Sequence, residues 1–199
     1  MPARLLLPSR HARGFTLIEL MVTVTLLSIL MALAFPSMGA WLRNSRVRAA
    51  SESLQNGLRL AQAEALRRSR QVVFSLTTNT TPQAGGFTAT ANGTTWSINT
   101  VPLLTDETAQ FVEGGVLTSV AADVAVTGPA AICFNSLGRI VANPAPGTGA
   151  ACTATTGQSY NVNLNPTAER PLRLLVELGG QVRMCDPAKA LASYPDGCP

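Results

Sequence analysis

The chain has 199 residues, of which 46% are hydrophobic and 13% are charged. This length allows one domain of ordinary size and one accessory element, and it excludes two large independent cores. The formal net charge is +4, but without Arg4, Arg10 and Arg13 the chain holds 12 basic and 11 acidic side chains. From Gln71 onward five basic side chains stand beside eight acidic ones, so the charge gives little support to a nucleic-acid-binding domain.

The first predicted element is an apolar helix over residues 15–35, directly after the basic residues 1–14. A helix of this length is close to the ~20 residues that are needed to cross a bilayer. The arginines before it place the N-terminus in the cytoplasm and the rest of the chain outside. Three interpretations compete: a plain membrane anchor, a secretory signal peptide cleaved after Ala32-Leu33-Ala34, and a segment processed ahead of the helix.

Glu19 discriminates among these interpretations, because it places a carboxylate inside the apolar run. Such a group costs roughly 2 to 3 kcal/mol on membrane insertion and serves no purpose in a segment that is discarded. An ionisable residue inside a membrane also needs a partner. Glu19 therefore favours an interpretation in which processing produces a cation near it.

Residues 14–20, GFTLIEL, resemble the prepilin processing and methylation motif of type IV pilins and type II secretion pseudopilins. The resemblance implies that residues 1–14 are a leader, that a prepilin peptidase cleaves between Gly14 and Phe15, and that Phe15 is then N-methylated. It also implies that Glu19 neutralises the new amine during filament assembly. We therefore expect a single-pass protein held in inner-membrane lipid with its head in the periplasm, and later a place in the pilus at the cell surface.

The helix is predicted to continue over residues 37–70, because apolar residues recur there at three- and four-residue steps. Proline kinks or ends helices, but the resemblance to pilins implies that one helix runs past Pro36 and covers residues 15–69. A β-sheet is expected to cover the apolar side. Arginines dominate the other side, where Glu64 can pair with Arg68 one turn later. The apolar positions are Val47, Ala50, Leu54, Leu58, Ala61 and Ala65.

Residues 71–184 are predicted to form an antiparallel sheet, because short β-rich runs alternate there with turn residues. Asn92-Gly93 and Gly179-Gly180 are each expected to join two strands in a hairpin. The stretch 143–158 reads as a surface loop, and residues 185–199 as an irregular tail. The result is an α+β fold, a long N-terminal helix packed on an antiparallel β-sheet head, which is the type IV pilin-like fold that the resemblance implies. The predicted strands are 72–76, 87–91, 94–98, 116–120, 124–127, 132–134, 160–164 and 172–178.

The four cysteines all lie in the C-terminal third, and an even number in a chain with an export-type start predicts disulfides. Four cysteines allow three pairings. We favour Cys133 with Cys152 and Cys185 with Cys198, because each bridge would close a loop rich in glycine and proline. A zinc site is the alternative, although C-x2-C spacing is absent and the only histidine, His11, lies in the leader.

The head resembles the FimT/GspH group of minor pilins and pseudopilins in two stretches, ICFNSLGR at 132–139 and GGQVRMCDP at 179–187. Some FimT-like proteins bind DNA in natural transformation through a Gly-Arg-x-Arg stretch near the C-terminus, and here residues 180–183 read Gly-Gln-Val-Arg. The missing arginine removes one phosphate contact, and such contacts dominate non-specific DNA affinity. The remaining candidates for DNA contacts are Arg183, Lys189, Arg173 and Arg170, and for Arg183 the alternative is an ordinary surface arginine.

The sequence contains no recognisable catalytic constellation: no histidine follows the leader, and a nucleophile elbow, a phosphate loop and a dinucleotide fingerprint are all missing. We therefore expect a protein that is not an enzyme and that uses no cofactor and no metal. The expected function is that of a minor pilin, which joins other pilins in a type IV pilus and supports its assembly, and in one interpretation natural transformation. Two alternatives stay open, a DNA-binding minor pilin for DNA uptake and a type II secretion pseudopilin of the GspH type.

Overall fold

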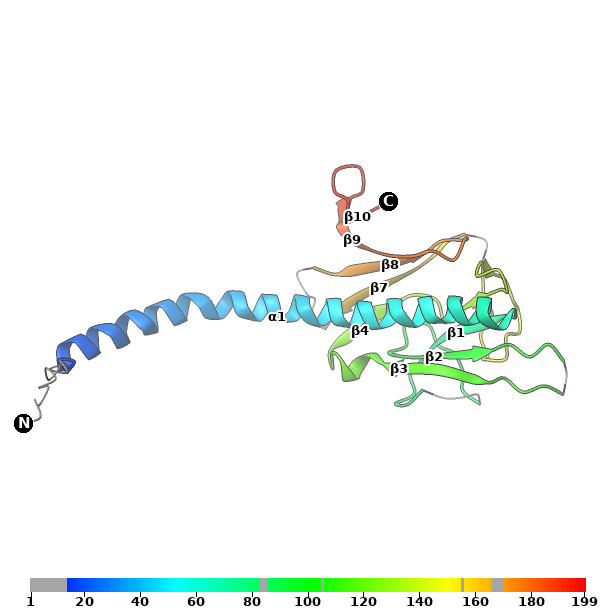
Figure 1. Ribbon diagram of the computed structural model, residues 1–199, viewed down its shortest axis with the longest axis horizontal. Helices are drawn as coiled ribbons and strands as arrows, with labels where there is room; N and C mark the ends of the chain where they lie inside the picture. The colour runs from blue at the N-terminus through cyan, green and yellow to red at the C-terminus, as the bar shows by residue number, and fades with distance from the viewer. Residues whose placement is uncertain (1–13, 83–85, 105, 155, 166–169) are drawn as a thin grey trace, which may run out of the picture. The chain divides into compact units, whose positions relative to one another are not determined.

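The structure is a computed structural model that describes residues 14–82, 86–104, 106–154, 156–165 and 170–199, and of Pro36 and Ser37 the backbone alone. The chain divides into two units, Met1–Gly39 and Ala40–Pro199. One helix, α1 (Leu17–Arg68), begins in the first unit and ends in the second (Figure 1). The helix continues through Pro36, as expected, so the leader call on residues 1–13 is the part of the N-terminal prediction that lies outside the described residues.

In the first unit, the helix presents an apolar surface on every side, and its large apolar side chains are exposed. By length and composition it is the one helix among the described residues that could cross a membrane. Its hydroxyl groups bond within the helix: Thr23 Oγ1 donates to the Leu20 carbonyl at 2.9 Å, and Ser28 Oγ donates to the Thr25 carbonyl at 2.9 Å. A helix that enters lipid must satisfy its polar groups internally in this way.

In the second unit, one side of α1 is completely buried. The six apolar positions predicted from the sequence, from Val47 to Ala65, all have no exposed surface, so the predicted stripe is confirmed. On the other side Glu64 bonds to Arg67 at 2.7 Å and to Arg68 at 2.8 Å, which confirms the expected pair with Arg68. Hydrogen bonds from Arg67 and then Arg68 lower the pKa of Glu64 to about 2.

The head contains two five-stranded sheets rather than one. Neighbouring strands are antiparallel throughout both sheets, except for the parallel pair β9 and β10 at the C-terminus. The first sheet has the order β3 (Phe111–Val116), β2 (Thr95–Thr100), β1 (Val72–Thr77), β5 (Ala131–Phe134) and β6 (Ile140–Val141). The second has the order β10 (Gly197–Cys198), β9 (Val182–Ala190), β8 (Leu172–Val176), β7 (Gln158–Leu164) and β4 (Val124–Thr127).

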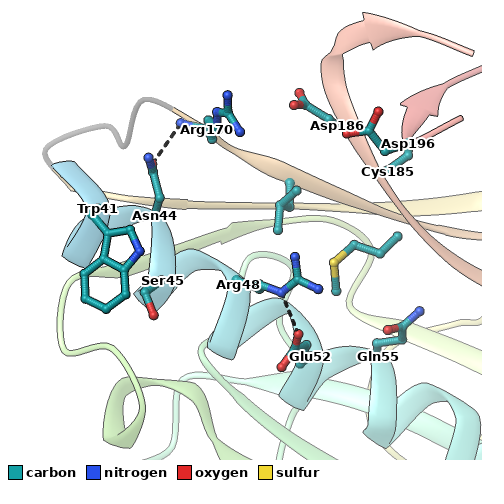
Figure 2. Close-up of a pocket in the computed structure, with 12 residues that line it drawn as sticks. Trp41, Asn44, Ser45, Arg48, Glu52, Gln55, Arg170, Cys185, Asp186 and Asp196 are labelled. Carbon is teal, nitrogen blue, oxygen red and sulfur yellow. Dashed lines mark hydrogen bonds and ion pairs between the residues drawn. The ribbon is translucent and has the colours of Figure 1, made fainter. Parts of the chain in front are cut away.

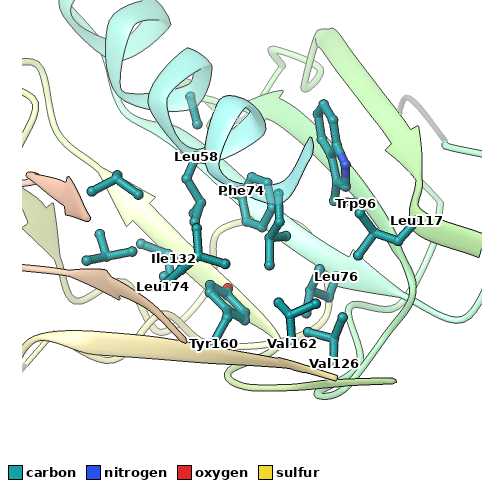
Figure 3. Close-up of a cluster of buried hydrophobic side chains, with 14 of the residues drawn as sticks. Leu58, Phe74, Leu76, Trp96, Leu117, Val126, Ile132, Tyr160, Val162 and Leu174 are labelled. Atoms are coloured by element: carbon teal, nitrogen blue, oxygen red, sulfur yellow. The ribbon is translucent and has the colours of Figure 1, made fainter. Parts of the chain in front are cut away.

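A single apolar core joins the buried side of α1 to both sheets (Figure 3). Phe74 on β1 lies at its centre, with its ring stacked on Trp96 of β2 at 5.9 Å and edge-on to Tyr160 of β7 at 6.2 Å. Leu58 supplies the helix side of this cluster. Fully burying a large apolar side chain contributes about 1.5 to 3 kcal/mol, so this cluster is what fixes the two sheets against the helix.

The hairpin predicted at Gly179-Gly180 is confirmed, since β8 pairs with β9 in the register Val176 to Val182. Gly180 N–H donates to the Glu177 carbonyl at 2.7 Å, which closes a tight turn. Gly180 itself has φ +87°, a conformation that residues with a side chain rarely adopt. Its glycine identity is therefore required by the turn.

Two predicted strands are wrong. Residues 87–91 form no strand, and β2 pairs instead with β1 and β3, so Asn92-Gly93 does not join a hairpin. The backbone of this stretch is used elsewhere: Ala89 N–H donates to the Thr148 carbonyl at 2.7 Å. Only Val116 of the predicted strand 116–120 is extended, because Leu117–Ser119 forms a 3-10 turn.

The C-terminal segment is more regular than expected. Strand β9 runs on to Ala190, and β10 pairs beside it, so the boundary placed at residue 185 falls within a strand. The short strand β6 was not predicted either. Both gains come from long-range pairing that local sequence does not announce, in β6 with β5 and in β9 with β10.

Candidate functional site

The N-terminal segment places the predicted processing bond outside the helix. Gly14, Phe15 and Thr16 precede the first helical residue, Leu17, and Phe15 is 81% exposed. Thr16 caps the helix, because its Oγ1 accepts a hydrogen bond from the Glu19 N–H at 3.2 Å. The bond between Gly14 and Phe15 therefore lies in extended chain, and a peptidase could reach it without unwinding the helix.

Glu19 occupies the first turn of α1, three residues after the cap. Thr and Glu at this spacing are the sequence signature of a capping box. A carboxylate is favoured here by the positive end of the helix dipole, which offsets part of its cost in an apolar segment. The same position brings Glu19 within one turn of Phe15, whose amine would be created by cleavage after Gly14.

The disulfides connect Cys133 of β5 to Cys152, and Cys185 of β9 to Cys198 of β10. This is the pairing that we favoured among the three. The first bridge lies beside the isolated pairing of Asn143 with Cys152, which crosses the predicted surface loop. The second holds β10 against β9, and the described residues contain no free cysteine.

The four arginine and lysine candidates for DNA contacts are not gathered into one basic surface. Arg183 donates to the Gly197 carbonyl at 3.1 Å, and Arg173 donates to Asn161 at 2.6 Å. Lys189 forms an ion pair with Asp196 and lies 5.6 Å from the ring of Tyr194. Arg170 is exposed at the start of β8, apart from the other three.

A groove of about 560 Å³ lies between the head's part of α1 and the second sheet (Figure 2). The sequence gave no sign of it, because its walls come from segments far apart in the chain. Its apolar lining is Trp41, Leu172 and Met184. Its charged lining is Arg48, which bonds to Glu52 at 2.9 Å, and Arg170, Asp186 and Asp196.

One loop of the head is held rigidly although its tip is apolar. Residues 101–110 connect β2 to β3, and Leu103 and Leu104 there are 71% and 67% exposed. Arg70, just after the end of α1, forms a two-point ion pair with Glu107 in this loop, with distances of 2.6 and 2.8 Å. The hydrogen bonds from Arg70 lower the pKa of Glu107 to about 2.

An exposed apolar helix that begins after a capped, cleavable N-terminus, and that continues into a disulfide-bonded β head, defines a membrane-anchored subunit of the pilin class. Residues 9–35 match the model of the prokaryotic N-terminal methylation motif, and residues 50–168 match the model of type II transport protein GspH. The second match covers more than half of the chain. The chain belongs to the GspH family, and its class is that of minor pilins and pseudopilins, which assemble with other pilins in a filament.

Solved structures show the same fold. The crystal structure of type IV minor pilin FimU from Pseudomonas aeruginosa aligns with a TM-score of 0.52 at 16% identity, over 75% of this chain and 95% of FimU. Minor pseudopilin EpsH from the type 2 secretion system of Vibrio cholerae aligns with a TM-score of 0.48 at 10% identity, over 72% of this chain and 99% of EpsH. A comparison with curated protein sequences found no match.

Proposed function

We propose that this chain is a minor pilin that is processed between Gly14 and Phe15, anchored in the inner membrane with its head in the periplasm, and then incorporated into a type IV pilus. The observation that carries the proposal is the contrast between the two parts of α1. Up to Phe35 the large apolar side chains are exposed and need lipid or other subunits, whereas from Val47 onward one side is buried by the head.

Glu19 distinguishes a filament subunit from a permanent anchor. A permanent anchor needs only lipid, and a carboxylate in its span costs roughly 2 to 3 kcal/mol without return. Processing by a prepilin peptidase supplies an amine at Phe15, one turn away, that can neutralise this carboxylate when the subunit leaves the bilayer. Inner-membrane lipid, the peptidase and neighbouring pilins are thus successive partners of the same short segment.

A structural role is favoured over an enzymatic one by the use that the head makes of its acids. Glu64, Glu107 and Asp196 are each paired with a basic side chain of the same chain. Acids engaged in this way stabilise the fold and are held ionised, so they are poorly suited to transferring protons.

The proposal is tested on the full chain produced in a host with a type IV pilus machine. Intact-mass spectrometry of protein extracted from membranes should give a chain that begins at Phe15 and carries one N-methyl group. Immunodetection in sheared surface filaments should then find the wild type, while Glu19→Leu stays in the membrane. A chain that retains Met1, or a wild type absent from filaments while its processing is complete, would contradict the proposal.

A pseudopilin of a type II secretion machine is the second candidate, favoured by the family model that matches residues 50–168. Both machines use the same N-terminal motif, so the mass measurement does not separate them. Deletion of the gene does: loss of surface filaments with normal protein secretion supports the pilus, and loss of secretion with normal filaments supports the pseudopilin.

A role as a DNA receptor in uptake and natural transformation has narrower support. Three of its four candidate residues bond to groups of the same chain, which leaves Arg170 as the most exposed of the set. Gel shifts with the detergent-solubilised full chain, comparing wild type with Arg170→Ala and Arg183→Ala at low and physiological salt, test this role. Failure of the wild type to retard DNA at low salt ends it.

A further inference from the structure

The loop of residues 101–110, here called the distal loop, is the most exposed apolar feature of the head's loops that has a rigid support. Its leucines, Leu103 and Leu104, are more than two-thirds exposed, and Phe111 at the start of β3 is 41% exposed. Adjacent exposed leucines favour association, and a subunit that must stay soluble at its head has no use for them unless a partner covers them.

Several bonds fix the shape of the distal loop. Arg70 donates to both carboxylate oxygens of Glu107 and also to the Val101 carbonyl at 2.9 Å. Glu107 in turn accepts the Leu103 N–H at 2.9 Å, and its own N–H donates to the Leu104 carbonyl at 3.2 Å. The leucine pair is therefore presented in one conformation, so that docking costs little ordering entropy.

The distal loop and the groove lie at opposite ends of the head. The loop is attached at Arg70, just beyond α1, and Figure 1 shows the connection from β2 to β3 extending past the C-terminal end of the helix. The groove is lined by residues from Trp41 to Gln55 of the same helix. From Trp41 to Arg68 the helix is about 40 Å long at ~1.5 Å per residue. A projection at one end and a hollow at the other suit subunits stacked in a filament, because such head-to-tail contacts do not close into a ring.

The two surfaces also match in chemistry. The distal loop offers two leucines and, beside them, the exposed carboxylate of Asp106. The groove offers the apolar side chains of Trp41 and Met184, with the exposed cation Arg170 at its edge. Its own acids are partly compensated, since Lys189 lies near both Asp186 and Asp196.

We propose that the distal loop is a docking knob: its leucines enter, on the head of the next pilin subunit, an apolar groove of the kind that this head carries, and Asp106 meets a basic side chain at the rim of that groove. The inference rests on the proposed function, because it names the surface through which a filament subunit meets its neighbour. It assigns the groove of this chain the reciprocal role, that of receiving the corresponding loop of another pilin.

Photocrosslinking in assembling cells tests the knob directly. A photoreactive amino acid at position 104 of the full chain should give an adduct with a pilin subunit, and mass spectrometry should map the attachment to that subunit's groove. The same probe at position 137 is the matched control, because Leu137 is 72% exposed in the turn between β5 and β6. An adduct with a protein of another class, or equal yields at the two positions, overturns the inference.

Incorporation into filaments provides a second measurement. The double variant Leu103→Asp, Leu104→Asp should fall about tenfold or more in sheared filaments, since each leucine loses its burial against the partner, whereas Leu137→Asp should remain at the wild-type level. Non-reducing gels of the membrane fraction check that both disulfides form in each variant. Wild type absent from filaments contradicts the proposed function, but wild type and double variant present in equal amounts contradict the knob alone. If the double variant fails to accumulate, the crosslinking yield at position 104 decides.

Discussion

Gly180 permits a sharp test of how the two sheets are joined. A Cβ at this position would lie 1.9 Å from the Gly138 carbonyl oxygen and 2.5 Å from Gln62 Nε2, and the backbone has φ +87°. An alanine there pays roughly 1 to 2 kcal/mol for the left-handed conformation. It also displaces the turn between β5 and β6 and breaks the 3.0 Å bond from Gln62 to Gly138, which adds about 1 kcal/mol.

We therefore expect Gly180→Ala to cost about 3 kcal/mol, which lowers the Tm by roughly 6 to 12 °C for a chain of this size. The assay is thermal unfolding of the full chain in detergent, followed by the fluorescence of Trp96, which is 7% exposed. Gly179→Ala is the control next door, because its Cβ would meet nothing within 4 Å, and it should stay within ~0.5 kcal/mol of wild type. Equal melting of the two variants would refute the contact between the turns.

Three further predictions follow from single groups. Thr16→Val removes the cap of α1 and should speed hydrogen exchange of the Glu19 amide in micelles several-fold, while Thr16→Ser retains protection. Tyr160→Phe should leave stability unchanged or raise it in chemical unfolding, because the buried hydroxyl has no partner among the described residues and a destabilisation above ~1 kcal/mol would show that it has one. The ion pair of Glu107 with Arg70 should hold the distal loop fully above pH ~4.5 and lose its contribution as the pH falls toward the folded pKa of about 2, which exchange of the loop amides measures, and protection that rises on acidification would contradict the assignment.

The helix and the larger strands could be predicted because their signals are local. The stripe from Val47 to Ala65 repeats at helical spacing, and it is buried as that spacing requires. Residues 72–76 and 172–176 are apolar runs bounded by turn residues, and both are strands. The glycine pair at 179–180 marks a hairpin correctly, since a positive φ is needed within it.

The failures have a different origin. Phe87 and Ala89 are buried and alternate like residues of a strand, but their backbone bonds to the loop at Thr148 rather than to a neighbouring strand. The alternation reports burial, which strands and buried loops share, so the pattern alone could not separate them. Long-range pairing decided the outcome, and the same holds for the end of β9, whose partner is supplied by the last residues of the chain.

The N-terminal site and the surfaces of the head differ in how far the sequence could reach. Gly14, Phe15 and Glu19 are adjacent along the chain, so their spacing is already their geometry. Arg70 and Glu107 are 37 positions apart, and their contact converts an ordinary polar loop into a rigid display of two leucines. Leu137 carries the same exposed side chain in a turn of the same head, so exposure alone cannot identify a docking surface. What separates the two positions is the ion pair that holds one of them in place, and this is why a comparison between positions 104 and 137 tests the mechanism rather than the hydrophobicity.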